Sequence, residues 1–223
     1  MDAFLQLEDP GVPIPPESTH IHNITDAMVK GKRINDDAVA TLLSDVNLVI
    51  AHNAQFDRGF VEARLPVFTN KAWACSFSQV PWNEEGISSG KLEFIAYRFG
   101  FHYEGHRASI DCHALLEVLQ SDLPESGTKV MTLLLSNVRT PMVKVWALNS
   151  AFESKDALKG HGYRWEIERR TWAVLMPADS LPTEIEWLRE HVYSNRPFKL
   201  ELEKIDAMNR FTSRRGSTEI VSY

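Results

Sequence analysis

Cysteine, long apolar runs and targeting signals are scarce or missing in this sequence. Its 223 residues include two cysteines, Cys75 and Cys112, which are too few for a disulfide framework. No apolar run approaches the roughly 18 residues of a transmembrane helix. The first residues lack the basic start and apolar core of a secretory signal. We therefore expect a reduced, cytoplasmic protein with no membrane partner.

Positive charge is also limited, since the net charge is −6. Residues 1–139 carry 11 Lys and Arg against 18 Asp and Glu, whereas residues 140–223 carry 13 against 12. This balance argues against broad, non-specific binding to phosphate backbones. An acidic first part can still act on nucleic acid where metal ions bridge its carboxylates to phosphate. The charge alone therefore excludes neither a nuclease nor a protein that never meets nucleic acid.

The spacing of apolar residues predicts an α/β domain over residues 1–138. A loosely alternating segment at residues 3–7 is typical of a strand, and the wholly apolar run at residues 48–51 indicates a strand buried on both faces. Amphipathic helices are expected between and after them, with Asn53 and Ser109 as N-terminal caps.

A second, smaller domain is predicted after Arg139-Thr140-Pro141. Residues 141–210 suit a compact α+β unit that contains a hairpin at residues 163–176. The polar residues 211–223 are expected to form a mobile tail.

Two acidic residues near helix starts, together with one histidine, suggest chemistry. Asp57 follows His-Asn-Ala-Gln-Phe at residues 52–56, and Asp111 follows His106 by five positions. Helix N-termini favour negative charge, so both carboxylates should stay ionised and able to bind Mg²⁺ or Mn²⁺. A histidine with an ordinary pKa of about 6.5 can take a proton from water. Taken singly, each acid is a common helix cap and the histidine a common surface residue; only the joint pattern favours metal-dependent hydrolysis.

These two motifs resemble the second and third motifs of the DEDD exonuclease superfamily, histidine subtype, which includes the proofreading epsilon subunit of bacterial DNA polymerase III. Residues 13–17 and 91–101 resemble the segments that flank those motifs, and the match extends over about residues 3–137. The resemblance implies a ribonuclease-H-like exonuclease fold, two Mg²⁺ or Mn²⁺ ions, and hydrolysis of phosphodiester bonds at the 3′ ends of nucleic acid. It also implies DNA as the favoured substrate, and a DNA polymerase or another replication or repair protein as a partner.

The resemblance also suggests a role for individual residues. By position, Asp57 and Asp111 match metal-binding acids, and His106 matches the general base. The positions of the second motif that match residues shaping the site are His52, Asn53 and Phe56.

The sequence departs from the family pattern at the first motif, an Asp-x-Glu on the opening strand. The nearby acids Glu8 and Asp9 lie in a turn instead. Three explanations remain open: Met1 is internal to a longer gene product, catalysis has been lost, or another chain completes the site; we expect the first. The leading hypothesis is a 3′-to-5′ exonuclease; the alternatives are a non-catalytic nucleic-acid-binding or polymerase-associated module, and a domain whose acids only cap helices.

The second domain resembles, more weakly, a C-terminal extension of some bacterial exonucleases. Basic and aromatic side chains gather in its first half and could meet phosphates and stack on bases. In the opposite interpretation the tryptophans form the hairpin core and the charges a solvated face. The candidate contact residues are Lys155, Lys159, Tyr163, Arg164 and Trp165.

Overall fold

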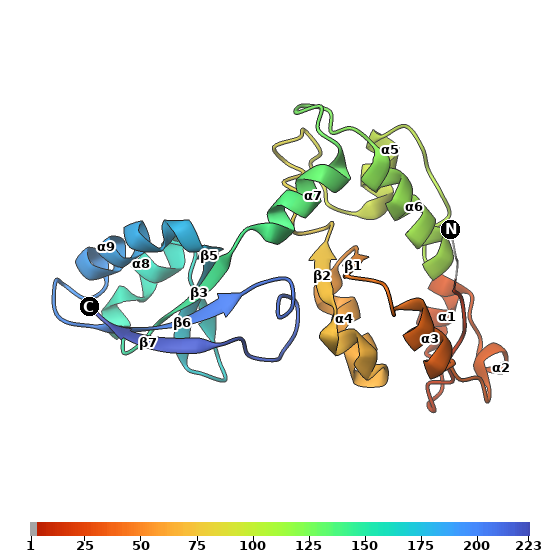
Figure 1. Cartoon of the computed structure of the whole chain (residues 1–223), viewed down its shortest axis with the longest axis horizontal. Coiled ribbons are helices and arrows are strands. Elements are labelled where there is room, and N and C mark those ends of the chain that lie inside the picture. The colour runs from red at the N-terminus through yellow and green to blue at the C-terminus, as the bar shows by residue number, and fades with distance from the viewer. Residues whose placement is uncertain (1–3) are drawn as a thin grey trace. The chain divides into compact units, whose positions relative to one another are not determined.

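The computed structural model describes residues 4–223, which divide into two compact units between Asn137 and Val138 (Figure 1). Each unit has its own sheet, and each is described by itself. Helix α7 (Val130–Arg139) extends across the boundary between them. Among the residues that the structure describes, none of the helices has the length and apolar character needed to span a bilayer.

The first unit is organised around a parallel pair of strands, β1 (Leu48–Ala51) and β2 (Ala72–Cys75). Helix α4 (Ala54–Arg64) and the short 3₁₀ helix η1 (Pro66–Asn70) connect them, so the segment is a βαβ unit. The run Leu-Val-Ile-Ala favours a strand because branched apolar side chains pack well on a pleated surface. Because the strands are parallel, their carboxyl ends meet at one edge, and the candidate site begins there.

The other helices of this unit pack apolar faces against each other and the strands. Ile95 on α5 and Val118 on α6 are completely buried. Helix α5 is followed by Gly100 at φ +88°, a left-handed conformation that glycine adopts readily at the end of a helix. The expected amphipathic helices are thus confirmed by their buried apolar faces. These helices are α1 (Pro16–His22), α2 (Asp26–Val29), α3 (Asp36–Leu42), α5 (Leu92–Arg98) and α6 (Ala108–Gln120).

The first segment is not the strand that its alternation predicts. Residues 4–7 are irregular, and residue 3 lies outside the described residues. The polar side chains of this segment hold it in place: the side-chain oxygens of Gln6 and Glu8 accept hydrogen bonds from the backbone amides of Asn35 and Ile34. The expected helix caps are only partly confirmed. Asn53 is the N-cap residue of α4, but its side chain makes no capping hydrogen bond there. Ser109 lies inside α6, whose N-cap residue is Arg107, so that expectation is wrong.

The second unit is an antiparallel sheet in the order β4-β5-β3-β6-β7, with α8 and α9 on one face (Figure 1). Val145, Leu200 and Leu202 from the sheet pack with Leu158 and Leu188 from the helices. The predicted hairpin is present as β4 and β5. The elements are β3 (Met142–Ala147), η2 (Phe152–Ser154), α8 (Lys155–Gly160), β4 (Arg164–Glu166), β5 (Thr171–Pro177), η3 (Ala178–Ser180), α9 (Leu181–His191), β6 (Lys199–Ile205) and β7 (Thr218–Ser222).

The expected mobile tail at residues 211–223 is wrong for its last part. Strand β7 pairs with β6, from Thr218 opposite Glu203 to Ser222 opposite Lys199. Thr218, Ile220, Val221 and Tyr223 are residue types that favour strands, but they follow a segment rich in Ser and Arg. Backbone pairing with the edge of β6 and the stacking of Tyr223 on Phe198 hold this end of the chain in place.

Candidate active site

Asp57 lies in the first turn of α4, just beyond the end of β1. The chain turns between strand and helix at Asn53, which adopts the left-handed conformation at φ +79°. The Asp57 side chain is half-buried and makes no ion pair among residues 4–223. Burial raises the pKa of its carboxyl. Asp57 is therefore a partly desolvated acid with no neighbouring cation to offset its charge.

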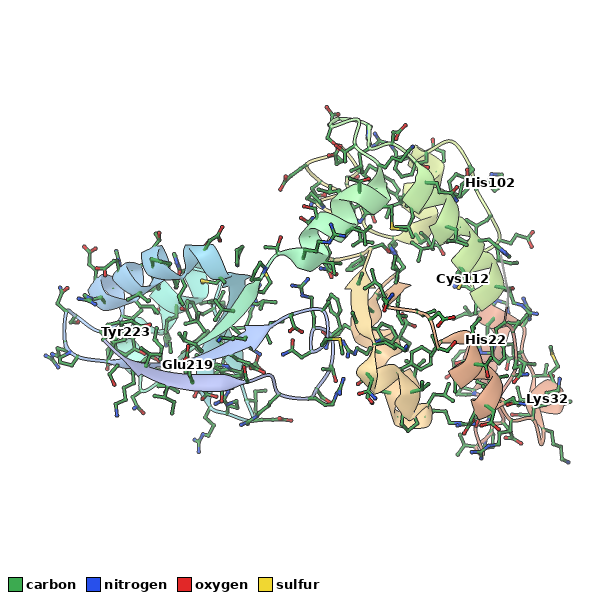
Figure 2. All side chains as sticks on the ribbon, in the orientation of Figure 1. His22, Lys32, His102, Cys112, Glu219 and Tyr223 are labelled. Atoms are coloured by element: carbon green, nitrogen blue, oxygen red, sulfur yellow. The ribbon has the colours of Figure 1, made fainter. Side chains whose placement is uncertain are left out.

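Asp111 lies in the first turn of α6, and the residue after it links it to Asp57. Desolvation, then the charges of Asp111 and Asp57, raise the pKa of the Cys112 thiol, which Figure 2 labels on α6. Two acids that are 54 positions apart in sequence thus come within electrostatic reach of one sulfur atom. The structure brings these two predicted residues into the same region.

The loop before α6 passes between two carboxylates at Gly105. A methyl group at this position would lie 3.0 Å from Oε1 of Glu93 and 3.5 Å from Oδ1 of Asp111. The Tyr103 ring borders the same place, and burial, followed by the charges of Asp111 and Glu93, raises the pKa of its hydroxyl. That hydroxyl is buried and, among residues 4–223, has no hydrogen bond of ordinary geometry. A side chain at this position would require the Glu93 carboxylate to move by a few tenths of an ångström.

His106 follows Gly105 and faces the same acid. Its Nε2 lies 3.8 Å from Oε1 of Glu93, and the histidine side chain is 60% exposed. Its backbone is left-handed at φ +66°, an uncommon conformation for a residue with a side chain. Such strain is often found at functional sites. The position suits a side chain that must reach water.

His52 has a different role from the other predicted residues, because both of its ring nitrogens are engaged within the fold. Nε2 lies 2.7 Å from the carbonyl oxygen of Gly90, which can only accept, so Nε2 carries the proton. Nδ1 lies 2.9 Å from Oγ of Ser76, which therefore donates to it. Burial lowers the pKa of His52, against the opposing effects of the Gly90 hydrogen bond and the Glu93 charge. A neutral His52 thus ties the end of β1 to the segment that leads into α5 and Glu93.

The remaining predicted positions of this motif are solvent-accessible. Asn53 is exposed, and Phe56 is 61% exposed and packs against Phe60 with ring centroids 4.9 Å apart. Sequence reasoning missed Glu93, Tyr103 and Gly105. The only signal for them was their position within the segment of residues 91–105 that leads to His106.

The carboxylates of the two aspartates are the kind of ligand that binds a divalent cation, but two residues are fewer than the three or more side chains of a typical metal site. Carboxylate oxygens are hard donors of the kind that Mg²⁺ and Mn²⁺ prefer. Within residues 4–223, however, no three His, Cys, Asp or Glu side chains come together as a metal site. The donor set that the structure places here is a pair of carboxylates, with Glu93 as a third acid close to Asp111.

The second unit places its candidate contact residues unevenly. Lys159 and Arg164 are exposed, and Trp165 is 48% exposed with its edge against Trp172. Lys155 lies with its Nζ 4.3 Å from the centre of the Phe152 ring.

Tyr163 is a correction to the predicted contact set. It is completely buried, and its hydroxyl donates to Glu184 at 2.8 Å. A side chain inside the core cannot stack on a base, so Tyr163 belongs to the fold of this unit and not to its surface.

Comparison with known proteins agrees with the geometry of the first unit. The RNase_T family model, described as exonuclease, matches residues 3–119, which is just over half of the chain. The chain is also similar to a DNA polymerase III PolC-type protein of Clostridium perfringens, with 30% identity over 126 residues. That alignment covers 54% of this chain and 9% of the relative, so the chain spans a small part of that protein. No solved structure matches.

The family match contains both acidic motifs, the His106 loop and the βαβ unit that positions them. A mixed α/β unit with a parallel pair of strands is consistent with the ribonuclease-H-like fold of such exonucleases. The chain therefore belongs to the RNase_T exonuclease family of the DEDD superfamily.

Proposed function

We propose that this chain is a nuclease that removes nucleotides from 3′ ends, with DNA as its favoured substrate and a divalent cation held by Asp57 and Asp111. The observation that supports this most strongly is the placement of the two acids: Asp57 and Asp111 lie in the first turns of separate helices, α4 and α6, yet both are close enough to Cys112 to contribute, after desolvation, to the raised pKa of its thiol. Neither carboxylate is neutralised by a cationic side chain among the described residues. A partly buried, unpaired acid costs stability, and such acids are common in functional sites.

His106 is the base in this proposal. When its Nε2 proton is directed at Glu93, the lone pair of Nδ1 remains free to accept a proton from a water molecule. Glu93 and Gly105 then act as positioning residues, one by facing the ring and the other by leaving room for that acid. Bound Mg²⁺ or Mn²⁺ would supply positive charge to pair with the phosphate and the attacking oxygen.

The proposed role of His106 as the base can be tested by the effect of its removal on turnover. Replacing His106 by alanine should slow nucleotide release roughly 10²–10⁴-fold, the usual contribution of a general base. Cation binding should be retained, because His106 is not one of the proposed ligands. Turnover within a few-fold of the original chain would rule out His106 as the base.

We propose as the second function a non-catalytic module that binds nucleic acid or associates with a polymerase. The observation that supports it is the similarity of this chain to a protein named as a DNA polymerase III. In this alternative the fold is kept for binding, and Asp57 and Asp111 hold no catalytic cation.

Calorimetric titration with Mn²⁺ distinguishes the two proposals, because only the nuclease proposal requires a cation bound by Asp57 and Asp111. We expect Asp57→Asn and Asp111→Asn each to weaken Mn²⁺ binding strongly. Glu117→Gln is the matched control, since Glu117 is an exposed acid on the same helix as Asp111. Equal Mn²⁺ binding by all four proteins would remove the proposed cation site and leave the binding module.

We also propose that the second unit contacts the substrate through its exposed hairpin and α8. Arg164 and Lys159 would meet phosphates, and Trp165 would stack on a base. Adding oligonucleotide should therefore quench the fluorescence of Trp165. In the Trp165→Ala variant, the quenching that comes from this residue should be absent. Unchanged quenching in the variant would argue that this face is only a solvated surface.

A further inference from the structure

A cavity of about 640 Å³ in the first unit gathers positive charge beside the start of α6. Its lining includes three basic residues, Lys32, Arg33 and Arg107, together with Ser109. No acidic residue is among the described residues that line it. Figure 2 labels Lys32, on the turn after α2. In a unit whose overall charge is negative, three cations in one cavity form a concentrated local basic site.

Two separate segments bring these cations together. Lys32 and Arg33 follow a tight turn at Gly31, whose φ of +68° is left-handed, and the amide of Lys32 bonds back to the carbonyl of Val29. Arg107 comes from the loop before α6 and donates from Nη1 to the carbonyl of His22 at 3.3 Å. That bond uses one of the five guanidinium donors, so others remain for a ligand.

Nearby acids do not neutralise this charge. Lys32 makes no ion pair among residues 4–223, and the Arg33 pair with Asp36 is a loose one at 3.8 Å between exposed side chains. Glu8 is engaged by Arg64 at 2.6 Å, and the Asp9 carboxylate accepts from backbone amides. The acids closest in sequence to the cavity are therefore already satisfied.

The rest of the lining is mostly apolar. Leu5, Leu7, Ile24 and Ala108 line the cavity together with the basic residues and with Gln6, whose side-chain oxygen already accepts a hydrogen bond from the Asn35 amide. Its volume falls within the range of about 300–1,000 Å³ that is usual for small-molecule sites. A ligand with an anionic group and a flat, weakly polar body matches this combination, and a nucleotide has both.

We propose that this cavity binds a nucleotide of the nucleic-acid strand, with its phosphate between Lys32, Arg33 and Arg107 and its sugar and base against Leu5 and Ile24. The inference rests on the proposed function, because it takes the strand to be the one whose end reaches Asp111. Ser109 and Asp111 share the first turn of α6 and are about 200° apart around the helix axis. The cavity and the acidic site thus lie on different sides of the first turn of α6, about 3 Å apart along the helix axis.

An acidic nuclease needs such an arrangement for a physical reason. The carboxylates of its site repel phosphate until a cation is bound, so affinity for the strand must come from elsewhere. A cavity that holds one phosphate close to the site supplies that affinity and also fixes the position of the strand. Binding at the cavity should therefore persist when the divalent cation is absent.

Fluorescence anisotropy of a 5′-labelled oligothymidylate, measured in EDTA on the whole chain, tests this directly. The double variant Lys32→Gln/Arg33→Gln should bind roughly tenfold more weakly. The slope of log affinity against log salt should also fall by about 0.7 for each lost contact. Lys30→Gln is the matched control, because Lys30 is exposed, two residues from Lys32, and outside the cavity lining. Lys30, Lys32 and Arg33 are all exposed, so neither variant should affect folding.

Competition identifies the ligand. Thymidine 5′-monophosphate should displace the oligonucleotide from the original chain, whereas inorganic phosphate at the same concentration should displace much less. Equal displacement by phosphate would overturn the nucleotide assignment, since only an anion site would be left. Equal affinity of the double variant and Lys30→Gln would overturn the cavity itself.

The outcomes for the cavity and for the proposed function are separable. If the double variant binds normally but Asp111→Asn abolishes nucleotide release, the nuclease proposal stands and the cavity proposal fails. If the double variant loses binding in EDTA while Mn²⁺ binding and Asp111 prove irrelevant, the cavity binds nucleic acid in a protein that is not a nuclease.

Discussion

His52 holds the candidate site together, and its removal should cost stability. His52→Ala deletes the hydrogen bonds to Gly90 (2.7 Å) and Ser76 (2.9 Å) and the edge contact with Phe77 (5.6 Å between ring centroids). Each hydrogen bond contributes about 0.5–1.5 kcal/mol, and the Gly90 carbonyl left without its partner adds a desolvation penalty. With the lost ring contact, the free energy of unfolding of the first unit should fall by about 2–4 kcal/mol.

The measurement should follow the first unit alone, because the second can unfold separately. Amide hydrogen exchange of Ala74 and Ile95, buried residues on β2 and α5, reports its stability under native conditions. His102→Ala is the control: His102 is an exposed loop histidine, labelled in Figure 2, and its removal should change little. A His52→Ala cost below about 0.5 kcal/mol, no larger than the control, would refute the reasoning.

The same interaction predicts a pH dependence with a definite sign. Burial lowers the pKa of His52 below its value in the unfolded chain, about 6.5. The neutral ring is therefore favoured in the folded state. Its contribution to stability is complete above the unfolded pKa and is lost as the pH falls towards the folded pKa. The original chain should lose stability in this window, and His52→Ala should lose less.

Three further substitutions test other parts of the structure. Asp57→Asn should raise the urea midpoint at neutral pH without added metal, because burial raises the pKa of this carboxyl and its charged form costs stability; a lower midpoint would contradict this. Gly105→Ala places a methyl 3.0 Å from Glu93 and should shift the NMR signals of the histidine next to it, so unchanged signals would count against the packing. Tyr163→Phe leaves buried Glu184 without its 2.8 Å donor and should cost about 1–3 kcal/mol in thermal unfolding of the second unit; an unchanged transition would show that the bond contributes little.

The sequence predicts elements whose signal is local. The apolar run of β1 and the amphipathic helices after it were both expected, because the spacing of apolar residues reports them directly. Strand β2 was not expected: Ala-Trp-Ala-Cys is short and does not alternate, and its pairing with β1 is a non-local contact. Strand β7 was missed for a related reason: it is a short segment after a stretch rich in Ser and Arg, and the backbone pairing with β6 that holds it is also a non-local contact.

The residues of the candidate site also fall into two groups, those that the sequence predicts and those that only the fold brings together. Asp57, His106 and Asp111 were found because they sit at fixed spacings within motifs. Glu93 was not, because it reaches His106 only through the fold, across the gap that Gly105 leaves. Asn53 was taken for a helix cap, yet its left-handed backbone turns the chain and its side chain caps nothing. Spacing identifies the acids, but only tertiary structure reveals which side chains position them.

The most direct test of the central claim is the fate of a 5′-labelled single-stranded oligonucleotide incubated with this chain and Mn²⁺. The account predicts a ladder of products shortened one nucleotide at a time from the 3′ end. The ladder should be absent in EDTA and absent with Asp111→Asn. An oligonucleotide that stays full length with Mn²⁺ present, or one shortened equally by Asp111→Asn, would contradict the claim that these two aspartates form a nuclease site.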